Sequence, residues 1–333
     1  MSETPRPAPS PQPIRIAVLA LEGCVASSVA GPLDVFAAAN RVSRDLGQGE
    51  PFAARIVRLE PGAVRSFHGL PVAPQQVARP GERFDLVLVP AVFDNLAGVV
   101  GEREAAAWLA AQHAAGARVA GVCAGAFLLA EAGLLDEREA TTHWALAGEF
   151  SRRYPRVALK PELLLVDTGD VLTAGGVTAY LDLCLHLVAR LASPELAALC
   201  AKVLLVEPGR RFQAPFALHT APRGHGDAAI LKAQDWLEAH LAGPIRIADA
   251  AKTASLGERT LLRRFRKATG DTPLDYVQRL RIESAKRLLE TTPRTVDDIA
   301  AVVGYADPTS FRRLFKARTG LTPDGYRRRF TAV

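Results

Sequence analysis

Cys123 has the setting of a nucleophile. It follows a strand pattern and precedes a helix pattern in the stretch RVAGVCAGAFLLAEAGLL, residues 118–135. A cysteine at the start of a helix can have its thiolate favoured by the helix dipole, and a thiolate can attack an electrophilic carbon. The residue could equally be a small side chain on a sharp turn that lines a pocket without chemistry. The C-terminal third of the chain bears on which interpretation holds.

Basic side chains are the second group that could act chemically, by binding phosphate. The chain has a formal charge of +6, from 41 Lys and Arg against 35 Asp and Glu. Residues 227–333 hold 20 Lys and Arg and 13 Asp and Glu, whereas residues 1–226 hold 21 and 22. The whole positive excess therefore lies in the last third. This distribution fits an electrostatic footprint on nucleic acid, although a merely soluble basic face would have the same composition.

An internal repeat in this basic region favours nucleic acid. TLLRRFRKATGDTPLDY (260–276) matches SFRRLFKARTGLTPDGY (310–326) at an offset of 50 residues. A short amphipathic helix pattern precedes each copy, at 247–254 and at 296–304. A short helix, a tight turn and a second, basic helix form a helix-turn-helix, and the sequence predicts two of them.

The second helix of each unit has an apolar face and a basic face. Leu261 and Phe265 lie four residues apart and should pack inward, as should Phe311 and Phe315. On the outward faces, arginine can recognise guanine by a bidentate contact, a leucine can meet a thymine methyl group, and other basic groups can hold phosphates. The outward residues, which we predict contact DNA, are Arg259, Leu262, Arg263 and Arg266 in the first unit and Thr309, Arg312, Arg313 and Lys316 in the second.

One long helix is predicted between the two units, over residues 272–292. Thr272 is its N-cap and Pro273 occupies its first turn. A stiff connector would hold the two basic helices at a fixed spacing, so that one chain could enter two major-groove segments about 34 Å apart. Arg279 and Arg281 on this helix are predicted to contact the phosphate backbone.

Residues 227–330 resemble the DNA-binding domain of the AraC/XylS family. The most specific part of the resemblance lies in RLRIESAKRLLETT (279–292) and VDDIAAVVGYADPTSFRRLFKARTG (296–320). The family's domain is an all-helical pair of helix-turn-helix units that regulates transcription. The resemblance therefore implies double-stranded promoter DNA and RNA polymerase as partners.

The first two-thirds of the chain alternate between strand and helix patterns. This alternation predicts a doubly wound, flavodoxin-like parallel sheet with helices on both faces. In such sheets ligands bind beyond the carboxyl ends of the strands, and Cys123 follows one of them. The apolar strand candidates are 14–21, 53–60, 84–92 and 117–122, and helical patterns such as 32–42 and 102–116 separate several of them.

Residues 14–206 resemble the ThiJ/PfpI-like, class I glutamine amidotransferase-like superfamily. GVCAGAF (121–127) matches its nucleophile elbow, AGPLDVFAAAN (30–40) its first helix, and ATTHWA (140–145) the segment carrying the family histidine, here His143. Such a domain fused to an AraC-type domain resembles the GlxA-like transcriptional regulators.

This resemblance also bears on Cys123 and His143. In an enzyme of the superfamily they would be nucleophile and base of a hydrolase, or of an enzyme acting on reactive aldehydes. Many such enzymes place an acidic side chain shortly before the proline of the first helix, where this sequence has Ser27 and Ser28. We therefore expect no enzyme activity. We expect instead a pocket in which Cys123, His143, Ser28 and Gly175 contact a small-molecule effector.

The remaining composition predicts a soluble, cytoplasmic protein without metal or cofactor. Cys24, Cys123, Cys184 and Cys200 lie far apart and form no CxxC pair, so neither a disulfide framework nor a zinc site is expected. No apolar run approaches the roughly 18 residues that a membrane span needs.

The sequence thus predicts a one-component transcription regulator. The first domain is expected to bind an effector, to form a homodimer, or both, and a pure dimerisation scaffold is the alternative. The linker has three prolines and three glycines, so we expect an effector to rearrange two protomers and not to push through the linker. The predicted segments are a disordered tail (1–13), a ThiJ/PfpI-like sensor domain (14–206), a linker (207–226) and a DNA-binding domain (227–333).

Overall fold

Short runs of branched apolar residues build the central sheet of the first unit. The computed structural model describes residues 12–218 and 223–331, and the chain forms two units that meet between Gln213 and Ala214. In spatial order the strands are β10 (Leu165–Asp167), β11 (Val171–Ala174), β7 (Arg118–Val122), β6 (Leu86–Val89), β1 (Ile14–Leu19), β2 (Phe52–Arg58) and β5 (Gln76–Val77). β10 and β11 are antiparallel, and all other neighbouring strands of this sheet are parallel.

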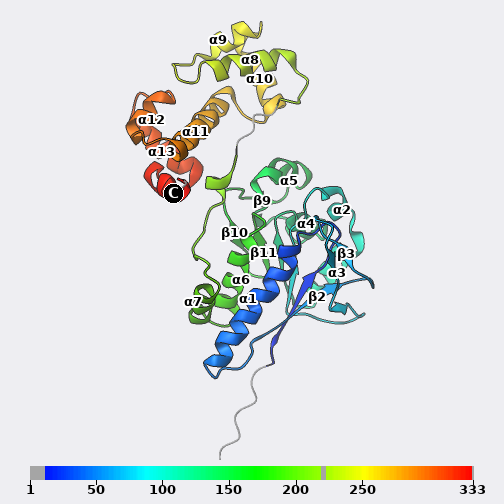
Figure 1. The fold of residues 1–333 in the computed structure, drawn as a ribbon. Coiled ribbons are helices and arrows are strands. Elements are labelled where there is room, and N and C mark those ends of the chain that lie inside the picture. Colours follow the sequence, from blue (N-terminus) through cyan, green and yellow to red (C-terminus); the bar gives the residue numbers. More distant parts are fainter. Residues whose placement is uncertain (1–11, 219–222, 332–333) are drawn as a thin grey trace, which may run out of the picture. The chain divides into compact units, whose positions relative to one another are not determined.

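Helices pack on both faces of this sheet. They are α1 (Ala26–Asp45), α2 (Leu96–Gly101), α3 (Arg103–Ala114), α4 (Gly125–Glu131), α5 (Ala147–Arg153), α6 (Ala179–Leu191) and α7 (Pro194–Val203), with a 3-10 turn η1 (Trp144–Leu146). α1, α6 and α7 pack together on one face, and α2, α3 and α4 on the other (Figure 1). This confirms the predicted doubly wound α/β class. Two small sheets complete the unit, formed by β3 (Val64–Arg65) with β4 (Pro71–Val72) and β8 (Glu139–Ala140) with β9 (Ala158–Leu159).

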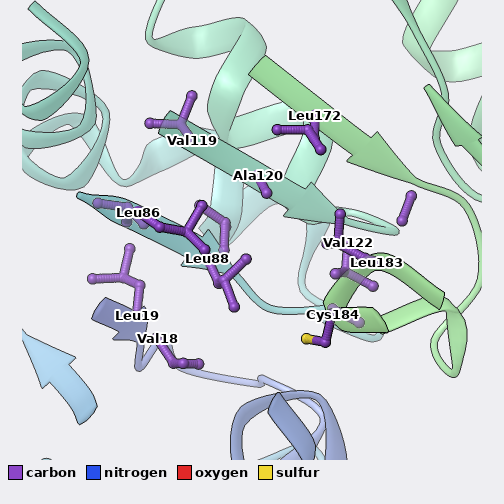
Figure 2. Packing of buried hydrophobic residues seen from close by; sticks show 14 of the residues in the cluster. Val18, Leu19, Leu86, Leu88, Val119, Ala120, Val122, Leu172, Leu183 and Cys184 are labelled. Carbon is purple, nitrogen blue, oxygen red and sulfur yellow. The ribbon is translucent and has the colours of Figure 1, made fainter. Parts of the chain in front are cut away.

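The core of this unit lies where the central strands meet α6. Figure 2 shows Val18, Leu86 and Ala120, which lie on the same face of three neighbouring strands, together with Leu183 and Cys184 of the helix. All five side chains are fully buried. A strand covered on both faces has no solvent-exposed side, so its residues are apolar in unbroken runs, as in the LVLV of β6.

Helix α1 begins earlier than its sequence pattern predicts. The pattern starts at Pro32, a residue favoured at the first turn of a helix. The helix instead begins at Ala26 and runs through this proline. Pro32 is therefore the seventh residue of the helix and lacks the N–H that would bond the carbonyl of Ser28, so one backbone hydrogen bond is lost. Burial of Val29 and Ser28 on the preceding turn accompanies this early start.

The second unit is entirely helical among its described residues. α9 with α10 and α12 with α13 form the two predicted helix-turn-helix units, which α11 connects, and α8 precedes them. The second unit's elements are η2 (Ala214–Phe216), α8 (Ala228–Ala239), α9 (Ile247–Thr253), α10 (Glu258–Thr269), α11 (Pro273–Thr291), α12 (Val296–Val302), α13 (Pro308–Thr319) and α14 (Pro323–Phe330).

Two small hydrophobic cores support the two helix-turn-helix units, and α11 contributes to both. Tyr276 and Val277 at its start belong to the first core, which also contains Phe265. Ile282 and Leu289 further along belong to the second core. One continuous helix therefore ties the two units together through its buried side chains.

Residues 207–226, predicted as a linker, contain segments that pack on each unit. Arg210 forms an ion pair with Asp182 of α6 in the first unit. Arg223 pairs with Glu238 of α8 in the second, with 3.0 Å between Nη1 and Oε1. Residues 219–222 of this segment lie outside the described residues, as do residues 1–11 of the predicted tail.

Candidate effector pocket and DNA interface

Cys123 lies on a sharp turn between β7 and α4. Its φ of 57° is left-handed, and its backbone N–H donates to the carbonyl of Ala174 at 2.7 Å. The turn brings α4 so close to the end of β6 that a Cβ on Gly125 would lie 2.8 Å from the carbonyl oxygen of Val89. A strained strand-to-helix turn of this kind is the backbone geometry of a nucleophile elbow.

The thiol on this turn is not activated. Only 1% of Cys123 is exposed, and burial raises the pKa of its thiol to about 12. A hydrogen bond from the N–H of Ala124 to the sulfur favours the thiolate, but it offsets burial only in part. At neutral pH the group is therefore a protonated thiol, whereas nucleophilic cysteines lie in electropositive, partly exposed surroundings that lower the pKa.

His143 is held in the neutral form. Burial lowers the pKa of its imidazole, and Nδ1 accepts the backbone N–H of Ala145 at 3.2 Å. The remaining proton is therefore on Nε2, which makes that nitrogen a hydrogen-bond donor. A general base needs a free lone pair facing its substrate, and this tautomer has none to offer.

Hydrogen bonds bring the segments of Cys123 and His143 together. The hydroxyl of Thr142, the residue before His143, donates to the carbonyl of Cys123 at 2.8 Å. The backbone N–H of Thr141 donates to Oγ1 of Thr173 in β11 at 2.7 Å. The elbow, the histidine segment and the end of β11 thus form one connected wall at the carboxyl edge of the sheet.

Gln213 completes this wall. Its side chain is buried, and Nε2 lies within hydrogen-bond distance of Thr141 Oγ1 (3.1 Å), the Thr142 carbonyl (2.7 Å) and the Leu163 carbonyl (3.1 Å). Oε1 accepts the backbone N–H of Trp144 at 3.1 Å.

Sequence patterns do not predict a role for this glutamine, because it lies in a Pro- and Gly-rich segment without periodicity. Gly175, which the sequence singled out, makes room for it, since a Cβ there would lie 2.5 Å from Nε2.

Ser28 has a structural role. Its buried hydroxyl donates to the carbonyl of Val25 at 2.8 Å and accepts the backbone N–H of Ala91 at 3.1 Å. These bonds fix the start of α1 to the loop after β6. Because its side chain is buried and its one hydroxyl proton is donated within the protein, Ser28 does not fit the predicted role of contacting an effector.

Helices α10 and α13 have the two faces that the sequence predicts. Leu261, Phe265, Phe311 and Phe315 are fully buried in the two small cores. The predicted DNA-contacting side chains are all exposed: Arg259, Leu262, Arg263 and Arg266 on α10, and Thr309, Arg312, Arg313 and Lys316 on α13.

Ion pairs divide the basic side chains of this unit into two groups. Inward-facing arginines have acidic partners: Arg264 donates to both carboxylate oxygens of Asp227 at 2.9 and 2.6 Å, and Arg318 to Asp275 at 2.9 Å. On the outward faces, Arg312 pairs with Asp297 at 2.7 Å. Of the basic side chains predicted to contact DNA from α10 and α13, the other five take part in no ion pair within the described residues: Arg259, Arg263, Arg266, Arg313 and Lys316.

The guanidinium of Arg281, which the sequence predicts to contact phosphate, binds groups inside the unit instead. It donates to the carbonyls of Leu241 at 2.9 Å and Gly243 at 2.7 Å, and it lies 5.3 Å from the ring centroid of Tyr305. Only glycine fits beside it at position 304, because the φ there is +91° and a Cβ would clash with the backbone carbonyl oxygen of Leu241 and lie 2.8 Å from the guanidinium. Arg281 therefore links the loop after α8 to the turn between α12 and α13. Arg279, two residues earlier, is exposed and forms a surface ion pair with Asp271 at 3.2 Å.

Metal-binding clusters, disulfides and membrane-spanning helices are absent from the described residues. No group of three or more His, Cys, Asp and Glu side chains there could hold a metal ion. All four cysteines are buried and free. None of the described helices is both long and apolar enough to cross a membrane.

Comparisons with known proteins match both units. Residues 14–190 match the model of the DJ-1/PfpI family, and residues 250–329 match a helix-turn-helix domain. The HTH-type transcriptional regulator CdhR of Pseudomonas aeruginosa is 30% identical over 286 residues, 86% of this chain and 83% of that protein. The HTH-type transcriptional regulator GlxA of Rhizobium meliloti is 30% identical over 325 residues, 95% and 96% of the two chains.

A solved structure has the same fold as the first unit. The crystal structure of a putative transcriptional regulator protein from Vibrio parahaemolyticus superposes with a TM-score of 0.52 at 20% identity. The match covers 58% of this chain and 100% of that one.

The protonation state of Cys123 predicts its reactivity. Because its pKa is raised to about 12, the thiolate fraction stays small up to pH 9 and grows only toward pH 12. Iodoacetamide at pH 7–9 should therefore label Cys123 in the folded protein far more slowly than it labels glutathione, as followed by mass spectrometry. Labelling of Cys123 at the glutathione rate would contradict this protonation state, and guanidinium-unfolded protein provides the reactive control.

Two neighbouring arginines of α11 should differ in their effect on stability. Arg281→Ala removes two charge-assisted hydrogen bonds to carbonyls and should lower the free energy of unfolding by about 2–4 kcal/mol. Arg279→Ala removes one exposed ion pair and should change it by less than about 0.5 kcal/mol. Urea denaturation of both variants measures the difference. Equal stabilities would mean that Arg281 does not hold the two helix-turn-helix units together.

Proposed function

The chain belongs to the DJ-1/PfpI family, and from this membership together with its helix-turn-helix domain we propose that it regulates transcription by binding promoter DNA sequence-specifically. Both relatives described above are named as HTH-type transcriptional regulators. The observation that carries the proposal is the set of outward cations on α10 and α13 without an acidic partner. Cations left unpaired on exposed helices are ready to replace the counterions of a DNA duplex.

The second helices of the two helix-turn-helix units, α10 and α13, are the recognition helices, and their side chains divide between contacts to bases and contacts to phosphates. Arg263 and Arg313 occupy matching places at an offset of 50 residues and contact base edges in successive major-groove segments. Arg279, on the connecting helix, contacts the phosphate backbone. Arg281 is excluded from this set by its hydrogen bonds inside the unit.

The first unit, residues 14–206, acts as the sensor. A small-molecule effector binds at the carboxyl edge of the sheet, near the wall formed by Cys123, His143 and Gly175. The protonated thiol and the neutral imidazole favour a binding role over catalysis. The same unit joins two protomers, and the DNA-bound dimer acts on RNA polymerase at the promoter.

Footprinting tests the DNA-binding proposal. Full-length protein should protect sites near its own gene, with two major-groove contacts per protomer about 10 base pairs apart, and a dimer should protect two such pairs. Affinity should fall steeply with salt, with a log–log slope steeper than about −3, because several basic side chains displace counterions. Failure to bind any such fragment, or binding that ignores salt, would contradict the proposal.

Substitution of the paired arginines tests the division of contacts. Arg263→Ala and Arg313→Ala should each cost about 1–3 kcal/mol of binding free energy and relax sequence preference at one half of the site only. Arg279→Ala should weaken binding to all sequences about equally, because a phosphate contact carries no sequence information. Selection of preferred sites from a random duplex library compares the three variants. The same preference in all of them would show that neither recognition helix contacts bases through these residues.

A further inference from the structure

The last residues of the first unit pair with the segment just before β10 through an isolated bridge. The backbone N–H of Leu164 donates to the carbonyl of Arg211, and that of Gln213 donates to the carbonyl of Glu162, both at 3.0 Å. These two bonds flank an antiparallel bridge between Leu163 and Phe212. We call residues 211–213 the strap. It is attached to the first unit along its backbone and, through Gln213, by a buried side chain.

The side chain of Gln213 connects the strap to the candidate pocket. Its amide donates to the carbonyl of Thr142, whose hydroxyl donates in turn to the carbonyl of Cys123. Two hydrogen bonds thus separate the nucleophile-elbow turn from the strap. The side-chain carbonyl oxygen of Gln213 accepts the backbone N–H of Trp144, the residue directly after His143. Gln213 therefore contacts the histidine segment on both sides of His143.

The residues that follow the strap are anchored in the second unit. Pro215 of η2 is buried, and the exposed ring of Phe216 lies 5.1 Å from that of Phe330 in α14. The carbonyl of Ala217 accepts a hydrogen bond at 2.7 Å from Nζ of Lys286 in α11. Lys286 is only 5% exposed, so this bond lies within the packed unit.

The two anchors leave almost no free chain between them. Gln213 and Pro215 are two residues apart, which limits their Cα separation to about 7 Å. A buried amide cannot leave its partners without leaving donors and acceptors unpaired, which costs more than an exposed hydrogen bond. A shift of the elbow or of the histidine segment therefore has to move Gln213 or break its bonds. Because residue 214 directly follows Gln213, either change alters the restraint on the chain where it leads into residues 214–217.

We propose that Gln213 is a positioning residue that couples the candidate effector pocket to the DNA-binding unit. This inference rests on the proposed function and adds the route of regulation. The coupling passes through the side-chain amide of Gln213 and the strap, and not through a free linker. Since coupling between two binding sites is reciprocal, DNA bound to the second unit must also change the energetics of the pocket wall.

Hydrogen exchange on the full-length protein tests this coupling without knowledge of the effector. The probe is a duplex that carries the footprinted site, and the readout is the exchange of the backbone amides of Thr141 and Leu164. Neither amide bonds to the side chain of Gln213. Saturating DNA should change their exchange rates in the wild-type protein by about fivefold or more, the lower end of typical coupling between sites.

Two variants remove the amide contact by different means. Gln213→Ala deletes the amide, and Gly175→Ala displaces it, because the new Cβ would lie 2.5 Å from Nε2. Both should bind DNA yet lose the DNA-dependent change at Thr141 and Leu164. Gln112→Ala is the matched control: this buried glutamine of the same unit donates to Glu82 (2.7 Å) and accepts from Phe84 (3.0 Å). The Gln112→Ala variant should lose about as much folding stability as Gln213→Ala but keep the DNA-dependent change in exchange at Thr141 and Leu164.

The outcomes separate this inference from the function on which it rests. A DNA-bound wild-type protein without any exchange change, or a full change in Gln213→Ala and Gly175→Ala, overturns the coupling and leaves DNA binding standing. A wild-type protein that binds no DNA overturns the proposed function and the coupling with it. If Gln213→Ala does not fold, Gly175→Ala alone decides, because it retains every hydrogen-bonding group of the strap.

Discussion

The arrangement of the DNA-binding unit depends on the partly buried guanidinium of Arg281. Each helix-turn-helix has only a small core of its own, and α11 alone could twist or bend between them. Arg281 closes this freedom by binding two carbonyls of the loop after α8 while its other side faces the ring of Tyr305. A partly buried cation is tolerated because carbonyl dipoles and an aromatic face replace its water. Gly304 is needed for this arrangement, because a side chain there would clash with the carbonyl of Leu241 and with the guanidinium.

A comparable rule organises the first unit: polar groups taken from water are paired within the protein. The amide of Gln213, the hydroxyl of Ser28 and the hydroxyl of Thr142 each hold two separate segments at the carboxyl edge of the sheet. In enzymes of similar fold this edge carries the reacting groups. Here the same edge contains a protonated thiol, a neutral imidazole and a network of hydrogen bonds, on which the proposed binding role rests.

The sequence predicted those features that repeat with a regular period. The parallel strands, the inward Phe265 and Phe315 and the exposed cations of α10 and α13 follow from periodicity and charge. Features that depend on contacts between distant segments could not be predicted from the sequence. Arg279 and Arg281 have the same charge and lie on one helix, yet only the loop after α8 makes one of them structural. Gln213 escaped notice because no local pattern distinguishes a buried side chain within a Pro- and Gly-rich segment.

The left-handed turn at Cys123 has a consequence for how such chains are classified. The turn places α4 against β6 and presents a carbonyl to Thr142, so the fold needs it whether or not the sulfur ever reacts. Backbone shape and chemical reactivity are therefore independent traits at this position. A comparison that scores only the shape of the turn cannot separate this chain from a relative with a reactive cysteine. One that scores the solvation of the sulfur will separate them, and it can be applied to any relative for which coordinates exist.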